Sequence, residues 1–323
     1  SRTFQRSSSR SVPSAEHTIC AGRAKPRHLI CFKQWTADMV LEIIRSAINL
    51  KCRVCDTHNK KMDVLAHSKV MILQEVNEPV LNMAVSKAAT FLGADDVNII
   101  DHLVWQNDYN GKIFSYMADA IFVATSTHMC VMRFAEQSLV PVMCMRSRTH
   151  ASIQALSTVM TIIEEYGTMK NITISYTGHA HPVLNSYLLL CPMLGAHIRF
   201  KCCCSESTAV SPLLLKASED MTTKSHTECK EYTDLGDVLA DTCVVIAGPT
   251  AHTKEEAMKF KITAQDIQNS TRCHWIFFHT CPRGPEVDDT LFEHCNSRTF
   301  HSFHNMQFIA AALMANAIKG YQF

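Results

Sequence analysis

The sequence predicts an α/β protein made of two doubly wound parallel-sheet domains joined by interdomain helices. Short apolar runs of strand length alternate with segments whose apolar residues recur at helical spacing, a pattern typical of parallel sheets covered by helices. The chain has 323 residues, more than the ~100–200 residues of one ordinary domain. It is 47% hydrophobic and 19% charged, which is typical of a globular protein and not of a disordered one.

The first domain is expected at residues 28–150. Its first helix, predicted at 37–50, places Met39, Val40, Ile43, Ile44 and Ile48 on one face. The elements expected after it are a strand at 70–73, a helix at 78–92 that ends at Gly93, a strand at 97–100, a helix at 111–117, a strand at 120–124, a helix at 131–138 and a strand at 140–145.

The second domain is expected at residues 151–302, and its first helix, at 151–166, is predicted to bridge the two domains. A β-rich segment, a turn at Gly178 and a helix that ends at Gly195 then open a second doubly wound unit. The expected elements are strands at 171–176, 196–200, 241–248 and 274–279 and a helix at 181–194. Residues 303–323 are expected to form a C-terminal helix, with its core at 305–318, that packs back on the first domain.

Residues 1–27 differ from the rest of the chain, because arginine and serine dominate and Glu16 is the only acid. Such a composition is typical of mitochondrial transit peptides, and a merely disordered leader is the alternative. Many of the fifteen cysteines lie in apolar segments, which indicates buried free thiols in a reducing compartment. We therefore expect the mitochondrial matrix, or otherwise the cytoplasm.

Charge and hydropathy exclude two classes of partner. A net charge of +1 gives no overall attraction to nucleic acid. No apolar run reaches the ~18–20 residues that a membrane-spanning helix needs. We therefore expect neither a nucleic-acid partner nor a membrane partner.

Five segments, in order along the chain, resemble the aspartate/ornithine carbamoyltransferase family, and in particular its ornithine carbamoyltransferases. Residues 275–289 (WIFFHTCPRGPEVDD) are similar to the HCLPR loop of these enzymes and its acidic continuation. The other four segments are residues 28–50, 115–119 (SYMAD), 153–164 and 183–200. The resemblance implies a first domain that binds carbamoyl phosphate, a second that binds the amino acid, and trimers whose sites are shared between subunits. It also implies a place in arginine and urea-cycle metabolism and no cofactor or metal.

The family's phosphate motif, Ser-Thr-Arg-Thr-Arg, is replaced. The corresponding residues here are Asn77, Glu78, Pro79, Val80 and Leu81. Both arginines are absent, Glu78 is negative, and Pro79 has no backbone donor. As structure, the segment predicts a helix start with Asn77 as the cap.

Other family positions have changed as well. Where a third arginine is expected the chain has Ala124-Thr125-Ser126, no arginine lies near Asn305, and the acid that pairs with the ornithine δ-amine is replaced by Ile246. Each charge-assisted hydrogen bond contributes ~1.5–3 kcal/mol, so these losses predict weak phosphate binding. The catalytic loop survives as the remnants His279, Thr280, Cys281, Pro282 and Arg283, and the substrate-binding candidates are Gln154, Asn185, Ser186 and Thr250.

These changes lead to a leading hypothesis and two alternatives. The first is a catalytically inactive or strongly impaired relative with a binding, regulatory or assembly role, as a homotrimer or a mixed trimer with an active paralogue. The second is an active carbamoyltransferase that makes citrulline or a related product through relocated basic residues, with Arg146 or Arg148 facing the cleft beside Arg283. The third is a sensor that binds a small molecule in the interdomain cleft without turnover.

Metal-binding and thiol patterns carry less weight. Cys52-x-x-Cys55-x-x-His58 resembles half of a zinc site but has no second pair. Cys202–Cys204 alternate in direction on a strand, and His179 and His181 fit a surface turn. Cys281 beside His279 would suit a thiolate nucleophile, but we expect a loop remnant and no metal site.

Overall fold

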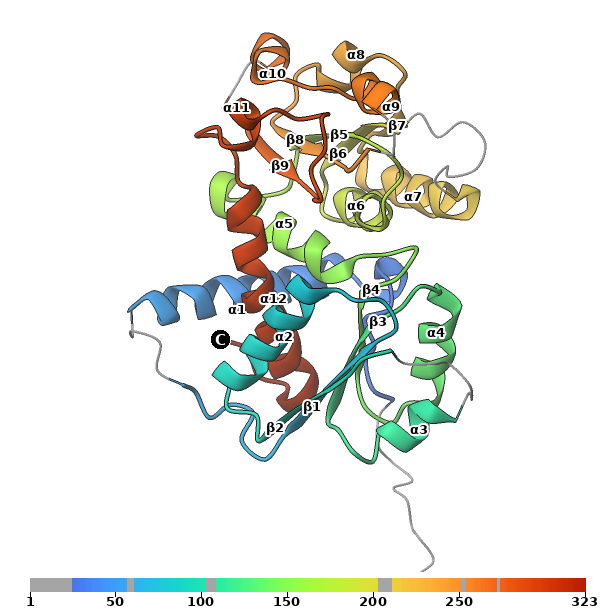
Figure 1. Ribbon diagram of the computed structural model, residues 1–323, viewed down its shortest axis with the longest axis vertical. Coiled ribbons are helices and arrows are strands. Elements are labelled where there is room, and N and C mark those ends of the chain that lie inside the picture. Colours follow the sequence, from blue (N-terminus) through green and yellow to red (C-terminus); the bar gives the residue numbers. More distant parts are fainter. Residues whose placement is uncertain (1–24, 57–60, 103–108, 203–210, 251–253, 272–273) are drawn as a thin grey trace, which may run out of the picture.

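The computed structural model describes residues 25–56, 61–102, 109–202, 211–250, 254–271 and 274–323, and these form two α/β domains stacked end to end (Figure 1). Every strand pairing within both sheets is parallel, so the predicted fold class is confirmed. The first sheet has the order β2-β1-β3-β4 and the second the order β7-β6-β5-β8-β9. The strands are β1 (Lys69–Gln74), β2 (Asp96–Ile100), β3 (Ala120–Ala124), β4 (Val142–Arg146), β5 (Thr173–Thr177), β6 (His197–Lys201), β7 (Cys229–Glu231), β8 (Val244–Ala247) and β9 (Ile276–His279).

The helices of the first domain follow the predicted pattern, with shifts at their ends. The α1 helix continues beyond the predicted Leu50 to Asp56, and α3 ends at Phe114 instead of Met117. The N-cap of α2 is Glu78 and not Asn77, because Pro79 fits the first helical position and the Glu78 N–H donates to Gln74 Oε1 at 3.1 Å. These helices are α1 (Ala37–Asp56), α2 (Pro79–Phe91), α3 (Asn110–Phe114) and α4 (His128–Gln137), preceded by the 3₁₀ turn Phe32–Gln34.

The second domain contains elements that the periodicity of the sequence did not predict. Strand β7 has three residues, and the helices from α7 to α11 are short or carry many polar residues. The predicted C-terminal helix is present but begins earlier, at Thr299. The helices are α5 (Ser152–Tyr166), α6 (Pro182–Met193), α7 (Pro212–Ser225), α8 (Leu235–Leu239), α9 (Lys254–Lys259), α10 (Ala264–Ser270), α11 (Asp289–Phe292) and α12 (Thr299–Lys319).

Two helices connect the domains. Figure 1 shows α5 lying between the sheets and α12 running from the second domain into the first. The α12 helix packs against α5, α1 and α2, and Asn305 Nδ2 donates to Thr161 Oγ1 at 2.9 Å and to Glu164 Oε2 at 2.7 Å. One hydrophobic cluster therefore extends through both domains.

Each sheet has a second face with a core of its own. On β3, Phe122 belongs to the shared cluster, whereas its neighbours Ile121 and Val123 point to a separate cluster under α4, as expected for alternating side chains on a strand. A third cluster lies on the outer face of the second sheet and includes Val245 and Phe277. No helix among the described residues is both long and apolar enough to cross a membrane.

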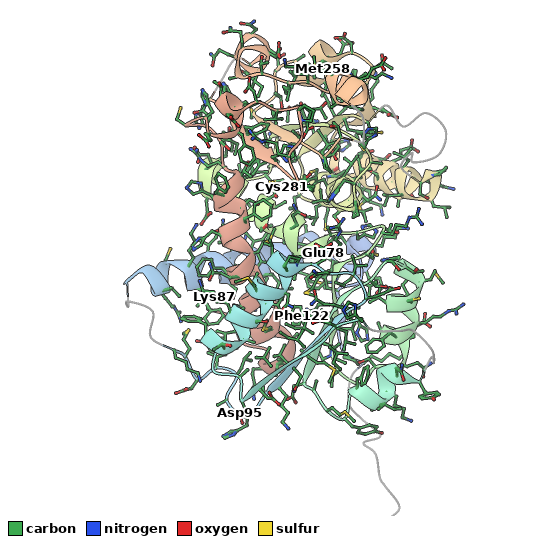
Figure 2. All side chains as sticks on the ribbon, viewed as in Figure 1. Glu78, Lys87, Asp95, Phe122, Met258 and Cys281 are labelled. Atoms are coloured by element: carbon green, nitrogen blue, oxygen red, sulfur yellow. The ribbon has the colours of Figure 1, made fainter. Side chains whose placement is uncertain are left out.

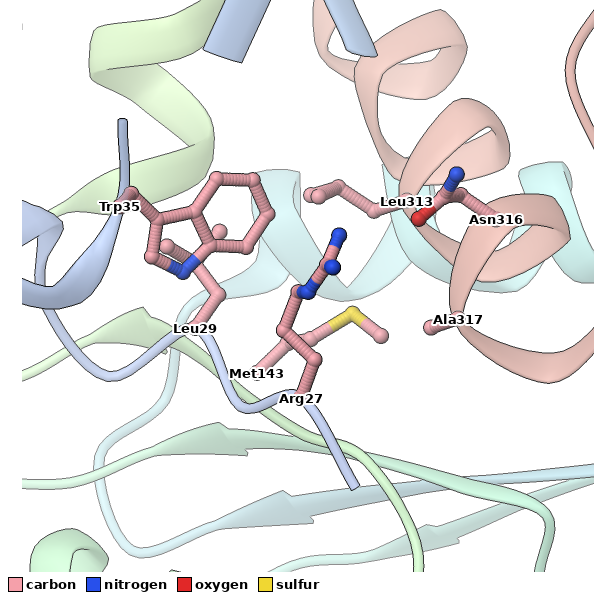
Figure 3. A pocket seen from close by; sticks show the side chains of 7 residues that line it. All are labelled: Arg27, Leu29, Trp35, Met143, Leu313, Asn316 and Ala317. Atoms are coloured by element: carbon pink, nitrogen blue, oxygen red, sulfur yellow. The ribbon is translucent and has the colours of Figure 1, made fainter. Parts of the chain in front are cut away.

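A small pocket lies in the first domain between the N-terminal segment, β4 and α12 (Figure 3). Arg27 extends into it toward Trp35 and Asn316. None of its lining residues is a predicted site residue, so the pocket is separate from the expected substrate site. The lining residues are Arg27, Leu29, Trp35, Met143, Leu313, Asn316 and Ala317.

Candidate functional site

The carboxyl ends of the strands face the junction between the domains. In each sheet the strand order reverses beside a central strand, at β1/β3 and at β5/β8, and ligands of doubly wound sheets bind outside such points. Figure 2 shows Glu78 on the side of the first domain that faces the second domain, and Cys281 opposite it at the base of the second domain. The structure thus brings the predicted phosphate segment and the predicted loop remnants to one junction.

Glu78, in the replaced phosphate motif, is bound to an arginine of its own chain. Arg146 Nη1 at the end of β4 donates to Glu78 Oε1, and the two side chains are 37% and 16% exposed. Burial raises the pKa of Glu78, and the nearby Arg146 partly offsets that rise. The positive charge of Arg146, beside residues 77–81, is therefore already paired.

A second carboxylate, Glu75, lies on the same loop and is bound by the end of β3. It accepts hydrogen bonds from Thr125 Oγ1 at 2.6 Å, from Ser126 N at 2.9 Å and from Ser126 Oγ at 2.8 Å. Hydroxyl and backbone N–H donors of this kind bind anions. Here they bind an anionic side chain of the protein, a feature that the sequence reasoning missed.

On the second domain, His279 and Glu286 form a buried pair. His279 Nε2 lies 2.9 Å from Glu286 Oε1, and both side chains are at most 1% exposed. Glu286 also accepts from Thr250 Oγ1 at 2.6 Å and from Gly284 N at 2.8 Å. Burial raises the pKa of Glu286, but the hydrogen bonds from His279, Thr250 and Gly284 outweigh it and lower the pKa to about 2. Glu286 was missed as a site residue, although it lies in the segment that carries the family resemblance.

Cys281 does not form a nucleophile–base pair with His279. Its backbone N–H donates to His279 Nδ1 at 2.9 Å, so both ring nitrogens of His279 are engaged. Burial is the main cause that raises the pKa of the Cys281 thiol, and the nearby Arg283 only partly offsets it. This geometry favours a structural loop and not thiolate chemistry.

The four substrate-binding candidates make hydrogen bonds within the protein. Gln154 Nε2 donates to Thr280 O at 2.9 Å, and Asn185 Nδ2 donates to Thr149 O at 2.9 Å. Ser186 Oγ accepts from Ala151 N at 3.1 Å. Thr250 is bound to Glu286, as described above. These residues therefore fix loops at the junction.

Some polar atoms at the junction remain without a partner. Within the described parts of the chain, Asn185 Oδ1, Thr280 Oγ1 and His179 Nε2 are buried and make no hydrogen bond. Buried polar groups usually have partners. These three atoms are enclosed by the protein, so they are polar groups that the contacts of the described residues leave unsatisfied.

The basic residues that an active alternative would use are paired or face solvent. Arg146 is paired with Glu78, and burial, followed by the nearby Arg146 and His279, lowers the pKa of His181 to about 3. Arg283 is 2.6 Å from Asp289 and stacks on the Phe292 ring at 4.6 Å. Three further candidates, Arg148, Lys87 and Lys112, are exposed.

The remaining metal patterns are described only in part. Cys52 is an exposed cysteine on α1, and Cys202, directly after β6, is buried. His58, Cys203 and Cys204 lie outside the described residues, as does the side chain of Cys55.

Comparison with known proteins gives one consistent result. Residues 170–317 match the sequence profile of the family described as aspartate/ornithine carbamoyltransferase, Asp/Orn binding domain. The chain is 24% identical to the mitochondrial ornithine transcarbamylase of Gallus gallus, over 96% of this chain and 90% of the relative. It is 23% identical to the mitochondrial ornithine carbamoyltransferase of Aquarana catesbeiana, over 92% and 88%.

Solved structures agree. The ornithine carbamoyltransferase from Pyrococcus furiosus superposes with a TM-score of 0.84 at 21% identity, over 92% of this chain and 98% of that chain. The mitochondrial ornithine carbamoyltransferase from Coccidioides immitis gives 0.83 at 19% identity, over 91% and 98%. Nearly the whole length of the chain therefore has this fold.

Proposed function

Because residues 170–317 match the profile of the aspartate/ornithine carbamoyltransferase family and 92% of the chain superposes on an ornithine carbamoyltransferase, we propose that the protein is an ornithine carbamoyltransferase-like protein that does not transfer carbamoyl groups at ordinary enzyme rates. Its role is then binding, regulation or assembly. The observation that carries this proposal is the Glu78–Arg146 ion pair in the replaced phosphate motif. Glu75, held by Thr125 and Ser126, adds a second carboxylate on the same loop.

The electrostatic argument is direct. Two like unit charges about 4 Å apart repel by about 4 kcal/mol at an effective dielectric constant of about 20. A phosphate dianion near Glu75 and Glu78 would meet such repulsion from both carboxylates, and Arg146 would have to leave Glu78 to bind it. Either cost alone weakens binding by orders of magnitude.

Two measurements on the purified protein test this proposal. We expect no citrulline from carbamoyl phosphate and ornithine above the uncatalysed background, and no heat of binding from millimolar carbamoyl phosphate in calorimetric titration. The protein is first shown to be folded by circular dichroism. Citrulline production at ordinary enzyme rates, or micromolar binding, would overturn the proposal.

The second candidate function is an active carbamoyltransferase with a rebuilt phosphate grip, and the position of Arg146 at the junction favours it. In that case Glu78 must move away from Arg146 when substrate binds. Arg146→Ala would then abolish the residual turnover, whereas Arg148→Ala, at an exposed position, would leave it unchanged. Equal turnover in the two variants would exclude Arg146 as the relocated phosphate ligand.

The third candidate function involves a small molecule that binds at the domain junction. The third function, a sensor, differs from the second in one respect: ligand closes the domains but no product forms. Small-angle scattering with and without ornithine, beside the citrulline assay, distinguishes the two.

Assembly and location are proposed from the resemblance. We propose a homotrimer, or a mixed trimer with an active paralogue, and the exposed apolar side chains of Val80 and Met83 on α2, 51% and 72% accessible, support a contact surface there. The mitochondrial names of the chicken and frog relatives, with the composition of residues 1–27, support the mitochondrial matrix. Light scattering gives the mass of the assembly, and an import assay with the full chain tests the location.

A further inference from the structure

Three side chains that carry metal-binding atoms meet in the first domain, apart from the carboxylates discussed above. Cys31, His128 and His150 each place one sulfur or nitrogen atom within 4.8 Å of the other two. They come from three separate segments: the N-terminal segment beside β4, the start of α4, and the loop between β4 and α5. The fold, and not a sequence motif, brings them together.

The two imidazole rings are oriented by serine hydroxyls. Ser147 Oγ lies 3.0 Å from His128 Nδ1, and Ser186 Oγ, from the second domain, lies 3.4 Å from His150 Nδ1. The rings meet edge to face with 5.2 Å between their centroids. Metal-binding histidines commonly use one ring nitrogen for the ion and the other for such a hydrogen bond, which leaves Nε2 of each ring for a ligand.

The three side chains differ in how far the protein encloses them. Cys31 and His128 are half-buried, whereas His150 is buried, so an ion can reach the cluster from one side. Lys33 follows Cys31 by two residues, and its positive charge opposes a cation.

We propose that Cys31, His128 and His150 bind a zinc ion, with the thiolate and two imidazole nitrogens as three ligands and water as the fourth. One sulfur and two nitrogens suit zinc, which takes four such ligands in a tetrahedron. Zinc–nitrogen bonds of ~2.0–2.1 Å and zinc–sulfur bonds of ~2.3 Å place the ligand atoms roughly 3.5 Å apart. Side-chain rotations that move the ligand atoms by about 1 Å bring the cluster to that size. The Cys31 thiol releases its proton to solvent when it binds the ion.

Such an ion would connect parts of the chain that meet at the domain junction. The N-terminal segment, the β3–α4 loop and the β4–α5 loop would share one ligand set, and Ser186 would link it to α6. Zinc binding to the folded state alone raises stability by mass action. The site therefore predicts a zinc-dependent melting temperature whether or not the protein has carbamoyltransferase activity.

Cobalt(II), a spectroscopic substitute for zinc, provides the test. The full chain, kept reduced, is titrated with cobalt(II) alone. We expect one cobalt ion to bind per chain and to give an absorption band from thiolate-to-cobalt charge transfer. Added zinc(II) should displace the cobalt and remove the band. Cys31→Ser removes the charge-transfer band and weakens binding at least ~100-fold, and Ser147→Ala weakens it ~10–100-fold while keeping the band.

The chain also contains a matched control. Cys295 is an exposed thiol with its sulfur 3.6 Å from His294 Nδ1, so Cys295→Ser removes a cysteine–histidine pair outside the proposed site and should change nothing. If Cys31→Ser does not fold by circular dichroism, His128→Ala replaces it and should abolish the zinc-dependent rise in melting temperature. No band in the wild-type protein, an unchanged band in Cys31→Ser, an unchanged zinc response in His128→Ala, or loss of the band in Cys295→Ser would overturn the proposal.

Discussion

Glu78 shows how one side chain can change the electrostatics at the start of a helix. A helix start that could present backbone donors to an anion instead presents a carboxylate bound to Arg146. The sequence predicted the loss of positive charge at residues 77–81. It did not predict the ion pair, because Glu78 and Arg146 are 68 residues apart in the chain and meet only when β1 and β4 take their places in the sheet.

The first prediction concerns this ion pair. Glu78→Gln removes the negative charge and keeps the side-chain size, so Arg146 becomes free to pair with an added anion. We expect the variant to bind carbamoyl phosphate or inorganic phosphate at least ~10-fold more tightly than the wild-type protein, which corresponds to about 1.4 kcal/mol. Calorimetric titration measures the affinity of the variant and sets a lower limit on the Kd of the wild-type protein.

Glu165→Gln is the control for Glu78→Gln. Glu165 pairs with Arg298 and His274 in the second domain, so this variant loses a paired carboxylate away from the first-domain site. It should leave anion binding unchanged. Equal affinities for all three proteins would contradict the electrostatic role assigned to Glu78.

The second prediction concerns Glu286, whose pKa is lowered to about 2 from an ordinary 4.5. A carboxyl with a lowered folded-state pKa stabilises the protein fully above about pH 4.5, and this contribution is lost as pH falls toward about 2. At 1.36 kcal/mol per pKa unit the contribution is about 3 kcal/mol. Glu286→Gln should therefore reduce the free energy of unfolding by about that amount at pH 7, and by progressively less below pH 4.5.

Urea unfolding of Glu286→Gln at several pH values gives the measurement. Glu293→Gln is the control, because Glu293 lies nearby in the chain but is exposed. A difference between wild type and Glu286→Gln that stays constant from pH 7 to pH 3 would show that the carboxylate charge is not what stabilises the loop.

At the scale of secondary-structure elements, the regular periodic segments were predictable and the irregular ones were not. The α5 helix and strands β1 and β3 lie within one or two residues of their predicted bounds, because their apolar residues repeat at one period. The α7 helix and strand β7 were missed, since α7 buries only Leu214 and Ser218 and β7 has three residues at the sheet edge. Such elements are stabilised by contacts with a neighbouring strand or helix, and the local sequence does not indicate which neighbour that is.

The third prediction uses two glycines that end helices in the left-handed region. Gly93, after α2, has φ +86°, and a Cβ there would lie 2.2 Å from the Met62 carbonyl oxygen. Gly167, after α5, has φ +76°, but nothing lies within 4 Å of its added Cβ. Gly167→Ala should cost only the conformational strain, about 1 kcal/mol, whereas Gly93→Ala should cost about 3 kcal/mol, because backbone must also move.

Chemical denaturation of the two glycine variants side by side provides the comparison. Both changes add the same methyl group at the same kind of helix end, so the difference isolates the close approach of residue 62. Equal losses of stability would mean that the chain before β1 moves away at little cost.

At the scale of the whole molecule, the site depends on how the carboxyl ends of the strands in the two domains are held at one junction (Figure 1). Sequence analysis placed residues 77–81 and 279–283 in different domains, and the family resemblance implied that they meet. The hydrogen bond from Gln154 on α5 to Thr280 at the end of β9 could not be read from local pattern. It forms because α5 follows the carboxyl end of β4 and lies between the two sheets (Figure 1).

The last prediction concerns the cooperativity of unfolding. Multidomain proteins often unfold in separate steps, but here a single hydrophobic cluster passes through α5 and α12 into both domains. Trp35 reports on the first domain and Trp275 on the second, and both are buried. The third tryptophan of the chain, Trp105, lies outside the described residues, so it is replaced together with Trp35 when Trp275 is to be the only reporter. In urea, Trp275→Phe and the double variant Trp35→Phe/Trp105→Phe should therefore give fluorescence transitions that coincide with the circular dichroism transition of the same variant.

Asn305→Ala tests the coupling itself. Asn305 is buried on α12 and donates to Thr161 and Glu164 on α5, so its loss should cost about 2–3 kcal/mol and lower both fluorescence midpoints together. His301→Ala, a change at an exposed position on the same helix, should leave both midpoints in place, because it changes the free energy of unfolding by no more than about 0.5 kcal/mol. If Asn305→Ala lowers one midpoint and leaves the other in place, the domains unfold independently. The α5–α12 contact would then join two separately stable units, and the shared cluster would not make them one cooperative core.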